Sequence, residues 1–263
     1  MKKYFLINWI IFKNAYIRDK KVPGAVFAGV MFHLVDIAMI IIFFNIIFSN
    51  TSSLAGWNFY QVLFLYAFAK CIVSINSGWI KGGLNDFATE LIRRGGFDFF
   101  MTKPVNPMIL VSMSRPRLYA FIAGIFEVGL CFYAIFAGHI NIGLANIFWF
   151  IILAILVNML YYFLQVLTVV PAFWFIKLWS LQDLMSRFNQ VMRYPAGVFP
   201  PVIRFILMSV FPIIAISFIP AQTLFYPPKI EYIIYIILIT LIFGMITNFL
   251  WKLGQSRYSS ASS

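Results

Sequence analysis

The chain has 263 residues, of which 62% are hydrophobic and only 11% are charged, and its formal net charge is +12. Soluble domains carry about 25% charged residues, so this composition excludes an ordinary soluble protein. The basic residues cluster at the ends of apolar blocks, which is typical of membrane orientation and not of nucleic-acid binding. The blocks are about 20 residues long without alternation, so we predict an all-α integral membrane protein.

The first segment, 1–25, is expected to form an interfacial helix and a cytoplasmic N-terminus. Residues 4–17 would rest their apolar side on the membrane and direct nearby basic residues to lipid phosphates, namely Lys2, Lys3, Lys13 and Arg18. Lys13 interrupts the apolar run and no small-residue cleavage site follows, so a signal peptide is not expected.

Apolar segments predict membrane spans at 26–48, 60–80, 116–137, 143–175 and 232–251, followed by a cytoplasmic tail at 252–263. The block 143–175 would be near ~50 Å long as a helix, so it must tilt, protrude, or bend near Pro171. A sixth span has two possible placements, 178–192 or 202–220. In the first placement, 200–228 dips into the outer leaflet and returns. Repeated prolines between 195 and 228 argue against an unbroken helix there.

The loop charges predict the orientation of these spans. The segment before residue 26 carries six Lys or Arg and one acid, and 81–117 carries six Lys or Arg and three acids. The loops 49–59 and 138–142 carry no Lys or Arg. Both termini are therefore predicted to be cytoplasmic, with six spans in one transmembrane domain, 1–263.

Three ionisable residues fall near the middle of predicted spans: Asp36, Lys70 and Glu127. An isolated charge at that depth costs at least ~2.5–3.5 kcal/mol, so we expect pairing, with Asp36 and Lys70 as the first choice. A structural ion pair, a polar substrate path and a proton relay remain open. Asn158 and Gln165 share one helix face, where interhelical hydrogen bonds are expected and a pore-lining role is the alternative.

The segment 84–94 has apolar residues at helical spacing on one face and charged residues on the other. Gly95 and Gly96 would stop this helix. We therefore predict a surface helix that joins the second and third spans and contacts a soluble partner.

The chemistry of common enzymes is not evident in this sequence. There is no glycine-rich phosphate loop, nucleophile elbow or cluster of metal ligands. Cys71 and Cys131 both lie in apolar spans and do not indicate a disulfide framework. We expect no catalysis, cofactor or metal in this chain.

Three motifs resemble those of a known family. The first is Gly95-Gly96-Phe97-Asp98, then Met101, Lys103-Pro104 and Asn106-Pro107. The second is Arg193-Tyr194-Pro195, then Phe199-Pro200, Arg204, Pro212 and Pro220-Ala221. The third is Trp251, Gly254 and Arg257-Tyr258-Ser259-Ser260-Ala261. Together they resemble the six-span permeases of type-2 ATP-binding-cassette (ABC-2) exporters, in the subfamily of about 260 residues without a fused ATPase.

The resemblance implies a half-transporter that pairs with an identical or related permease and is driven by a separate cassette ATPase, which alone would bind ATP. It implies export of a small amphipathic molecule, peptide or drug across the cell membrane. It also favours the outer re-entrant segment before the last span. The ATPase-coupling surface would comprise Leu84, Phe87, Glu90, Leu91, Arg93, Arg94, Asp98, Lys103 and Pro104.

Two other functions remain open at this point. An ion-coupled secondary transporter could use Asp36 and Glu127 as proton carriers, although no inverted repeat is visible. A non-transporting immunity or scaffold protein could use the surface helix to bind its partner.

Overall fold

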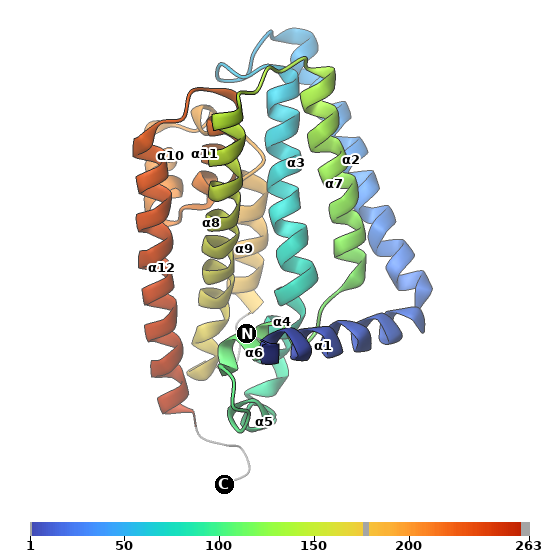
Figure 1. Ribbon diagram of the computed structural model, residues 1–263, viewed down its shortest axis with the longest axis vertical. Coiled ribbons are helices and arrows are strands. Elements are labelled where there is room, and N and C mark those ends of the chain that lie inside the picture. The colour runs from blue at the N-terminus through green and yellow to red at the C-terminus, as the bar shows by residue number, and fades with distance from the viewer. Residues whose placement is uncertain (1, 176–178, 259–263) are drawn as a thin grey trace.

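The computed structural model describes residues 2–175 and 179–258, and these residues form helices without a β-strand. Figure 1 shows long helices that run between two ends of the molecule, with α1 (Lys2–Lys20) lying across one end. We call the end that carries α1 the inner end. The opposite end, which carries the loop 51–58, is the outer end.

Five helical stretches in the described chain are long and apolar enough to cross a membrane. They are α2 (Pro23–Asn50), Phe59–Leu91, α7 (Leu118–Ala137), Leu144–Phe173 and α12 (Ile230–Arg257). This confirms the predicted helical membrane class. Residues 252–257, which we expected in the tail, are the last turns of α12, and residues 259–263 lie outside the described residues.

The second stretch corrects the prediction of a separate surface helix. It combines α3 (Phe59–Asn76), the π-helical turn η1 (Ser77–Lys81), α4 (Gly82–Asp86) and a second π-helical turn, η2 (Phe87–Leu91). Residues 84–91 therefore continue the second span. A Cβ atom on Gly82 would lie 2.0 Å from the Arg115 carbonyl oxygen, so this glycine permits close backbone packing and does not end the helix.

The chain turns after Leu91, and Gly95 has the positive φ of 69° that favours glycine at such a turn. Two short helices follow, α5 (Phe97–Met101) and α6 (Pro107–Ser112). The long stretch 144–173 ends as α8 (Leu144–Val169) changes into the 3₁₀ turn η3 (Val170–Phe173) at Pro171. The backbone changes where we expected it to bend, because proline cannot donate the helical hydrogen bond.

The chain after residue 178 forms α9 (Trp179–Val191) and then the 3₁₀ turn η4 (Ala196–Val198). Asn189 of α9 accepts a hydrogen bond from the Tyr161 hydroxyl in the middle of α8 at 3.0 Å. Further along, a Cβ atom on Gly197 would lie 2.9 Å from the Cβ atom of Ala55 in the outer loop. The chain thus passes from the middle of the bundle to its outer end between 189 and 197.

The next segment does not form an unbroken span over 202–220. It comprises α10 (Pro201–Phe205), the π-helical η5 (Ile206–Val210) and α11 (Ile213–Phe225), with a bend of 93° between 201–210 and 213–225. The Asn146 side chain, at the outer start of α8, donates to the Thr223 carbonyl at 3.0 Å. A bent pair of this kind is either a broken span or a re-entrant loop, so the placement of the sixth span stays a prediction.

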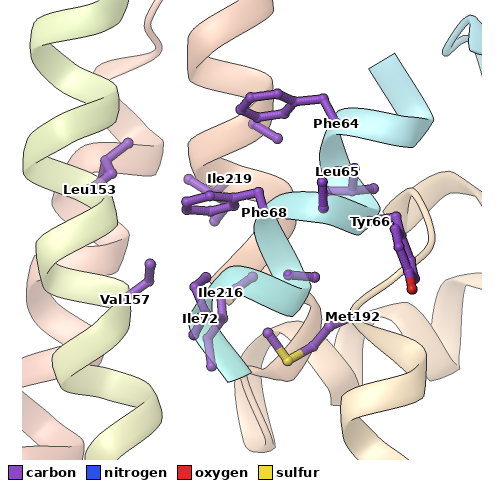
Figure 2. Packing of buried hydrophobic residues seen from close by; sticks show 14 of the residues in the cluster. Phe64, Leu65, Tyr66, Phe68, Ile72, Leu153, Val157, Met192, Ile216 and Ile219 are labelled. Carbon is purple, nitrogen blue, oxygen red and sulfur yellow. The ribbon is translucent and has the colours of Figure 1, made fainter. Parts of the chain in front are cut away.

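The core is centred on α3, since 78% of the most apolar window of its stretch is buried, against 11% for α2. Figure 2 shows Phe64, Phe68 and Ile72 of α3 facing Ile216 and Ile219 of α11, with Leu153 and Val157 of α8 nearby. The central position of α3 explains why its polar residues contact several other elements.

Candidate functional site

A group of charged and polar side chains lies in the middle of the bundle. We call Asp36, Tyr66, Lys70 and Arg193 the midplane cluster. The Lys70 ammonium lies 2.7 Å from Asp36 Oδ2, and the Tyr66 hydroxyl donates to the same oxygen at 2.9 Å. The Arg193 guanidinium lies 3.5 Å from Asp36 Oδ1. The structure therefore contains the ion pair expected from the equal depth of Asp36 and Lys70.

Arg193 was not expected in this cluster. In the sequence it was named only as part of the second family motif, Arg193-Tyr194-Pro195. Its guanidinium lies 5.6 Å from the Tyr66 ring centroid, where a cation–π contact adds to the attraction of Asp36. The side chains of Asp36 and Arg193 are 26% and 22% exposed, so the cluster is not sealed inside the chain. The sequence pattern does not predict that Arg193 contacts α2 and α3, because its position depends on the irregular backbone after α9.

Glu127 does not join the midplane cluster and instead contacts a residue that we had not assigned to any site. The fully buried Glu127 carboxylate lies 3.3 Å from His33 Nδ1, and its second oxygen has no hydrogen-bond partner among the described residues. His33 and Asp36 are three residues apart on α2, so they share a helix face. That spacing was the signal available in the sequence.

Of the two predicted amides on α8, Asn158 takes part in an interhelical hydrogen bond and Gln165 contacts a tyrosine that makes one. Asn76 of α3 donates to Asn158 Oδ1 at 3.1 Å. Gln165 donates to the Tyr161 hydroxyl at 2.8 Å, and that hydroxyl reaches Asn189 of α9. Asn158 also lines an apolar cavity of about 670 Å³ beside α3 and α8, together with Ile75 and Ala154. Asn158 thus takes part in an interhelical hydrogen bond and also lines a cavity.

Helix α9 has a polar face that no described part of the chain covers. Asp183, Ser186, Arg187 and Gln190 are exposed on it, whereas Met185 is buried on the other side. The spacing of three, four and seven residues keeps the polar group on one side of the helix. Charged side chains at membrane depth face water-filled space or protein rather than lipid, so this face requires one of those neighbours.

Five aromatic residues form what we call the inner aromatic cluster: Phe87, Phe97, Phe173, Trp251 and Tyr258. The Phe87 ring centroid lies 4.9 Å from that of Trp251 and 5.1 Å from that of Phe173. The cluster joins η2, α5, η3 and the end of α12. Burial raises the pKa of the Tyr258 hydroxyl and the Asp98 carboxylate raises it further, so Tyr258 is neutral at physiological pH.

This cluster explains the spacing of the C-terminal motif and corrects part of the predicted coupling surface. Trp251, Gly254 and Tyr258 face Phe173 from one side of the chain, and a Cβ atom on Gly254 would lie 2.1 Å from the Phe173 ring. Leu84 is 1% exposed and Phe87 is fully buried, so neither can contact a separate partner. Their burial follows from the continuation of α3 into this region.

The remaining predicted surface residues lie at the inner end and are accessible in different degrees. Leu91 and Asp98 are half-buried, whereas the following are exposed: Glu90, Arg93, Arg94, Lys103 and Pro104. Glu90 and Arg94 form an ion pair at 3.2 Å. The sequence reading missed Phe99 and Met101, which are exposed on α5, with the Lys103 ammonium 4.2 Å from the Phe99 ring centroid.

A groove of about 450 Å³ lies between α1 and the segment 99–105. Ile7 and Ile11 line it from α1, and Phe99, Phe100 and Pro104 line it from the other side. The N-terminal helix and the segment after the second span therefore share one surface. The Lys13 and Arg18 side chains of α1 are exposed, while those of Lys2 and Lys3 lie outside the described residues.

Comparison with known proteins gives one match. A family described as ABC-2 family transporter protein matches residues 34–262. This range includes all of the midplane cluster and all of the inner aromatic cluster. No curated protein and no solved structure matches the chain.

Proposed function

Because the chain belongs to the ABC-2 family of transporter proteins, we propose that it is the permease subunit of an exporter driven by a separate cassette ATPase. Members of this family are membrane components of transporters and are not themselves catalytic. The chain would supply the pathway, and ATP would bind only to the partner subunit.

The polar face of α9 is the observation that carries the pathway assignment. Asp183, Arg187 and Gln190 are exposed on a helix that packs against α8 within the bundle. Lipid does not solvate such groups, whereas an aqueous pathway or a second permease does. The partly exposed carboxylate of Asp36 supports the same assignment, because it lies at the middle of a spanning helix.

A second permease copy, identical or related, would complete this pathway. Half-transporters of this size enclose a pathway only when two chains face each other, and the uncovered face of α9 is suited to that space. The cavity beside Ile75 and Asn158 is mostly apolar with a few amide and hydroxyl groups. A small amphipathic molecule, peptide or drug matches this lining.

The inner end supports the coupling assignment. Glu90, Arg93 and Arg94 are exposed beside Phe99 and Met101 of α5, and exposed apolar side chains next to charges are typical of partner contacts. The inner aromatic cluster connects this surface to η3 and α12. Movement of the ATPase would therefore reach two further spans through packed rings.

The loop charges support a cell-membrane protein with cytoplasmic N- and C-termini. In Figure 1, α1 lies at the same end as the C-terminal turns of α12. The basic segments before residue 26 and at 81–117 also lie at that end. The positive-inside rule then assigns the inner end to the cytoplasm.

The test begins with a pull-down in mild detergent followed by mass spectrometry, for which we expect a cassette ATPase as the main co-purifying protein. The permease is then reconstituted into vesicles with and without that ATPase. Vanadate-sensitive export that requires both subunits supports the proposal. Uphill transport by the permease alone would overturn it.

The contact between Glu127 and His33 favours one second candidate, an ion-coupled transporter. A buried carboxylate beside an imidazole is suited to carrying a proton. In the same vesicles, a protonophore would abolish transport by this mechanism and vanadate would not. The Glu127→Gln variant would then lose transport even when the ATPase is present and active.

A further inference from the structure

Two basic residues are brought together where the segment 115–117 packs against the inner part of the second span. The Arg117 backbone N–H donates to the Gly78 carbonyl at 2.7 Å. Gly82 allows the Arg115 backbone to approach, as its missing Cβ atom shows. Lys81 lies one helical turn after Gly78, so Arg117 and Lys81 are neighbours at this contact. We call Lys81 and Arg117 the inner cation pair.

The nearby acids lie closest to other cations, although the Asp86 carboxylate also attracts Arg117. Asp86 lies 2.7 Å from Arg115, and Asp19 lies 2.8 Å from Arg18 while it also accepts from the Leu118 N–H at 3.2 Å. The cations Lys81, Arg117, Arg115 and Arg18 therefore outnumber the acids Asp86 and Asp19 in this region. Among the described side chains, neither Lys81 nor Arg117 has an acidic group within 4.0 Å.

This arrangement is costly unless an anion is bound. Both side chains are partly buried, and like charges that lose water repel each other more strongly. A phosphate or carboxylate placed between an ammonium and a guanidinium forms charge-assisted hydrogen bonds with both. Lys81 lies about 33 Å along the helix from the outer start of that helix at Phe59. Since a hydrocarbon core is about 30 Å thick, this distance corresponds to its inner boundary.

The position of the pair connects it to the midplane cluster. Tyr66, Lys70, Ser77 and Lys81 follow each other at intervals of four, seven and four residues, which keeps them on one face of the helix. Lys81 is about 16 Å from Lys70 along that face. An anion at the inner cation pair therefore lies at the inner end of a polar track that leads to the middle of the membrane.

We propose that the inner cation pair binds the phosphate or carboxylate headgroup of an anionic amphiphile at the cytoplasmic boundary of the membrane. This deepens the proposed function by naming a substrate class, and its place in transport rests on that function. The binding itself requires neither the ATPase nor transport. Its test can therefore fail while the transporter assignment stands, and the reverse also holds.

The experiment measures binding of hexyl phosphate to the full-length permease in neutral phosphatidylcholine nanodiscs by isothermal titration calorimetry. Hexyltrimethylammonium, with the same tail and opposite charge, is the matched probe. We expect the double variant Lys81→Gln/Arg117→Gln to bind hexyl phosphate about tenfold more weakly or worse. The charge-preserving variant Lys81→Arg/Arg117→Lys should bind within about threefold of the wild type.

The control variant Lys252→Gln/Arg257→Gln removes two exposed cations at the same end and should bind like the wild type. Equal loss in this control, or no loss in the Lys81/Arg117 variant, overturns the proposal. So does wild-type binding of hexyltrimethylammonium as tight as that of hexyl phosphate. Thermal unfolding is recorded for each variant, and the single Arg117→Gln variant replaces the double variant if the latter is unstable.

Two further arms distinguish the source of the anion. Inorganic phosphate that competes at the concentration of hexyl phosphate overturns the amphiphile assignment, because the tail then contributes nothing. Phosphatidylglycerol in the nanodisc that weakens hexyl phosphate binding to the wild type, and not to the double variant, supports the site with a lipid as its occupant. Unchanged binding with this lipid supports the site with the transported molecule as its occupant.

Discussion

The midplane cluster and the inner aromatic cluster each join several helices, but they do so by opposite means. Asp36, Lys70 and Arg193 are held by charge, and Asp36 and Arg193 remain partly exposed. Phe87, Phe97 and Trp251 are held by ring packing, and each is almost fully buried. A charged contact exchanges readily for water or a ligand, whereas packed rings lose contact area when they separate. We infer that the bundle rearranges at the charges in its middle while the inner end moves as a unit.

Removal of a ring from the inner aromatic cluster should produce the largest effect. Trp251→Ala leaves a cavity between Phe87, Phe97 and Phe173, and large-to-small changes of this kind cost about 3–5 kcal/mol. We expect a clear fall in the unfolding temperature in detergent. Phe249→Ala is the matched control, because Phe249 lies on the same helix and is 66% exposed. An equal fall in the unfolding temperature of both variants would contradict a localised cluster.

Removal of one charge from the midplane cluster should have a smaller effect. Lys70→Met leaves Asp36 with Arg193 at 3.5 Å, so we expect a loss of about 2 kcal/mol, below the range for a fully orphaned buried charge. Adding Asp36→Asn should restore much of the stability in thermal unfolding. A double variant as unstable as Lys70→Met alone would show that the ion pair does not determine packing here.

The loss of an uncharged polar contact should reduce stability less than the loss of a residue from either cluster. Asn158→Leu removes the acceptor of the Asn76 amide, and a hydrogen bond between membrane helices contributes about 0.6–1.7 kcal/mol. A double-mutant cycle with Asn76→Leu measures the coupling free energy directly. A coupling free energy larger than that of the Asp36–Lys70 pair would contradict the expectation that the ion pair contributes more than the amide hydrogen bond.

The smallest effect on stability, with the sharpest effect on function, is expected at the coupling surface. Reversing the charges of Glu90, Arg93 and Arg94 alters exposed groups, and the Glu90–Arg94 ion pair is re-formed with opposite sign. The unfolding temperature should change little, since exposed pairs contribute about 0–1 kcal/mol. Stimulation of the partner ATPase should be lost, as measured with the reconstituted complex, and unchanged stimulation would remove these residues from the interface.

The extent of prediction differed between the two clusters for physical reasons. The pair of Asp36 and Lys70 was accessible from the sequence, because two charges at equal depth in neighbouring spans have a strong reason to meet. Arg193 was not accessible, since its position depends on the broken backbone between α9 and α11. The ends of most spans followed from hydropathy within a few residues.

The inner end was harder to predict because a glycine can either end a helix or allow another backbone segment to pack closely against it. The predicted span ended at residue 80 and the predicted surface helix began at residue 84, yet Gly82 and Gly83 continue the helix and make room for the backbone at 111–115. Leu84 and Phe87 had the spacing of a membrane-facing stripe, and that stripe instead packs against the ends of α8 and α12. Helical periodicity shows which residues share a face, but it does not show what covers that face.

The continuous helix from Phe59 to Leu91 also has a mechanical consequence. Phe87 is fixed in its ring cluster, and Lys70 lies about 25 Å further along the same rod. A tilt of about 10° with its fulcrum at Phe87 would displace Lys70 sideways by about 4 Å. That displacement exceeds the 2.7 Å separation between Lys70 and Asp36. A small tilt of the helix at the inner end is therefore enough to break this ion pair in the middle of the bundle.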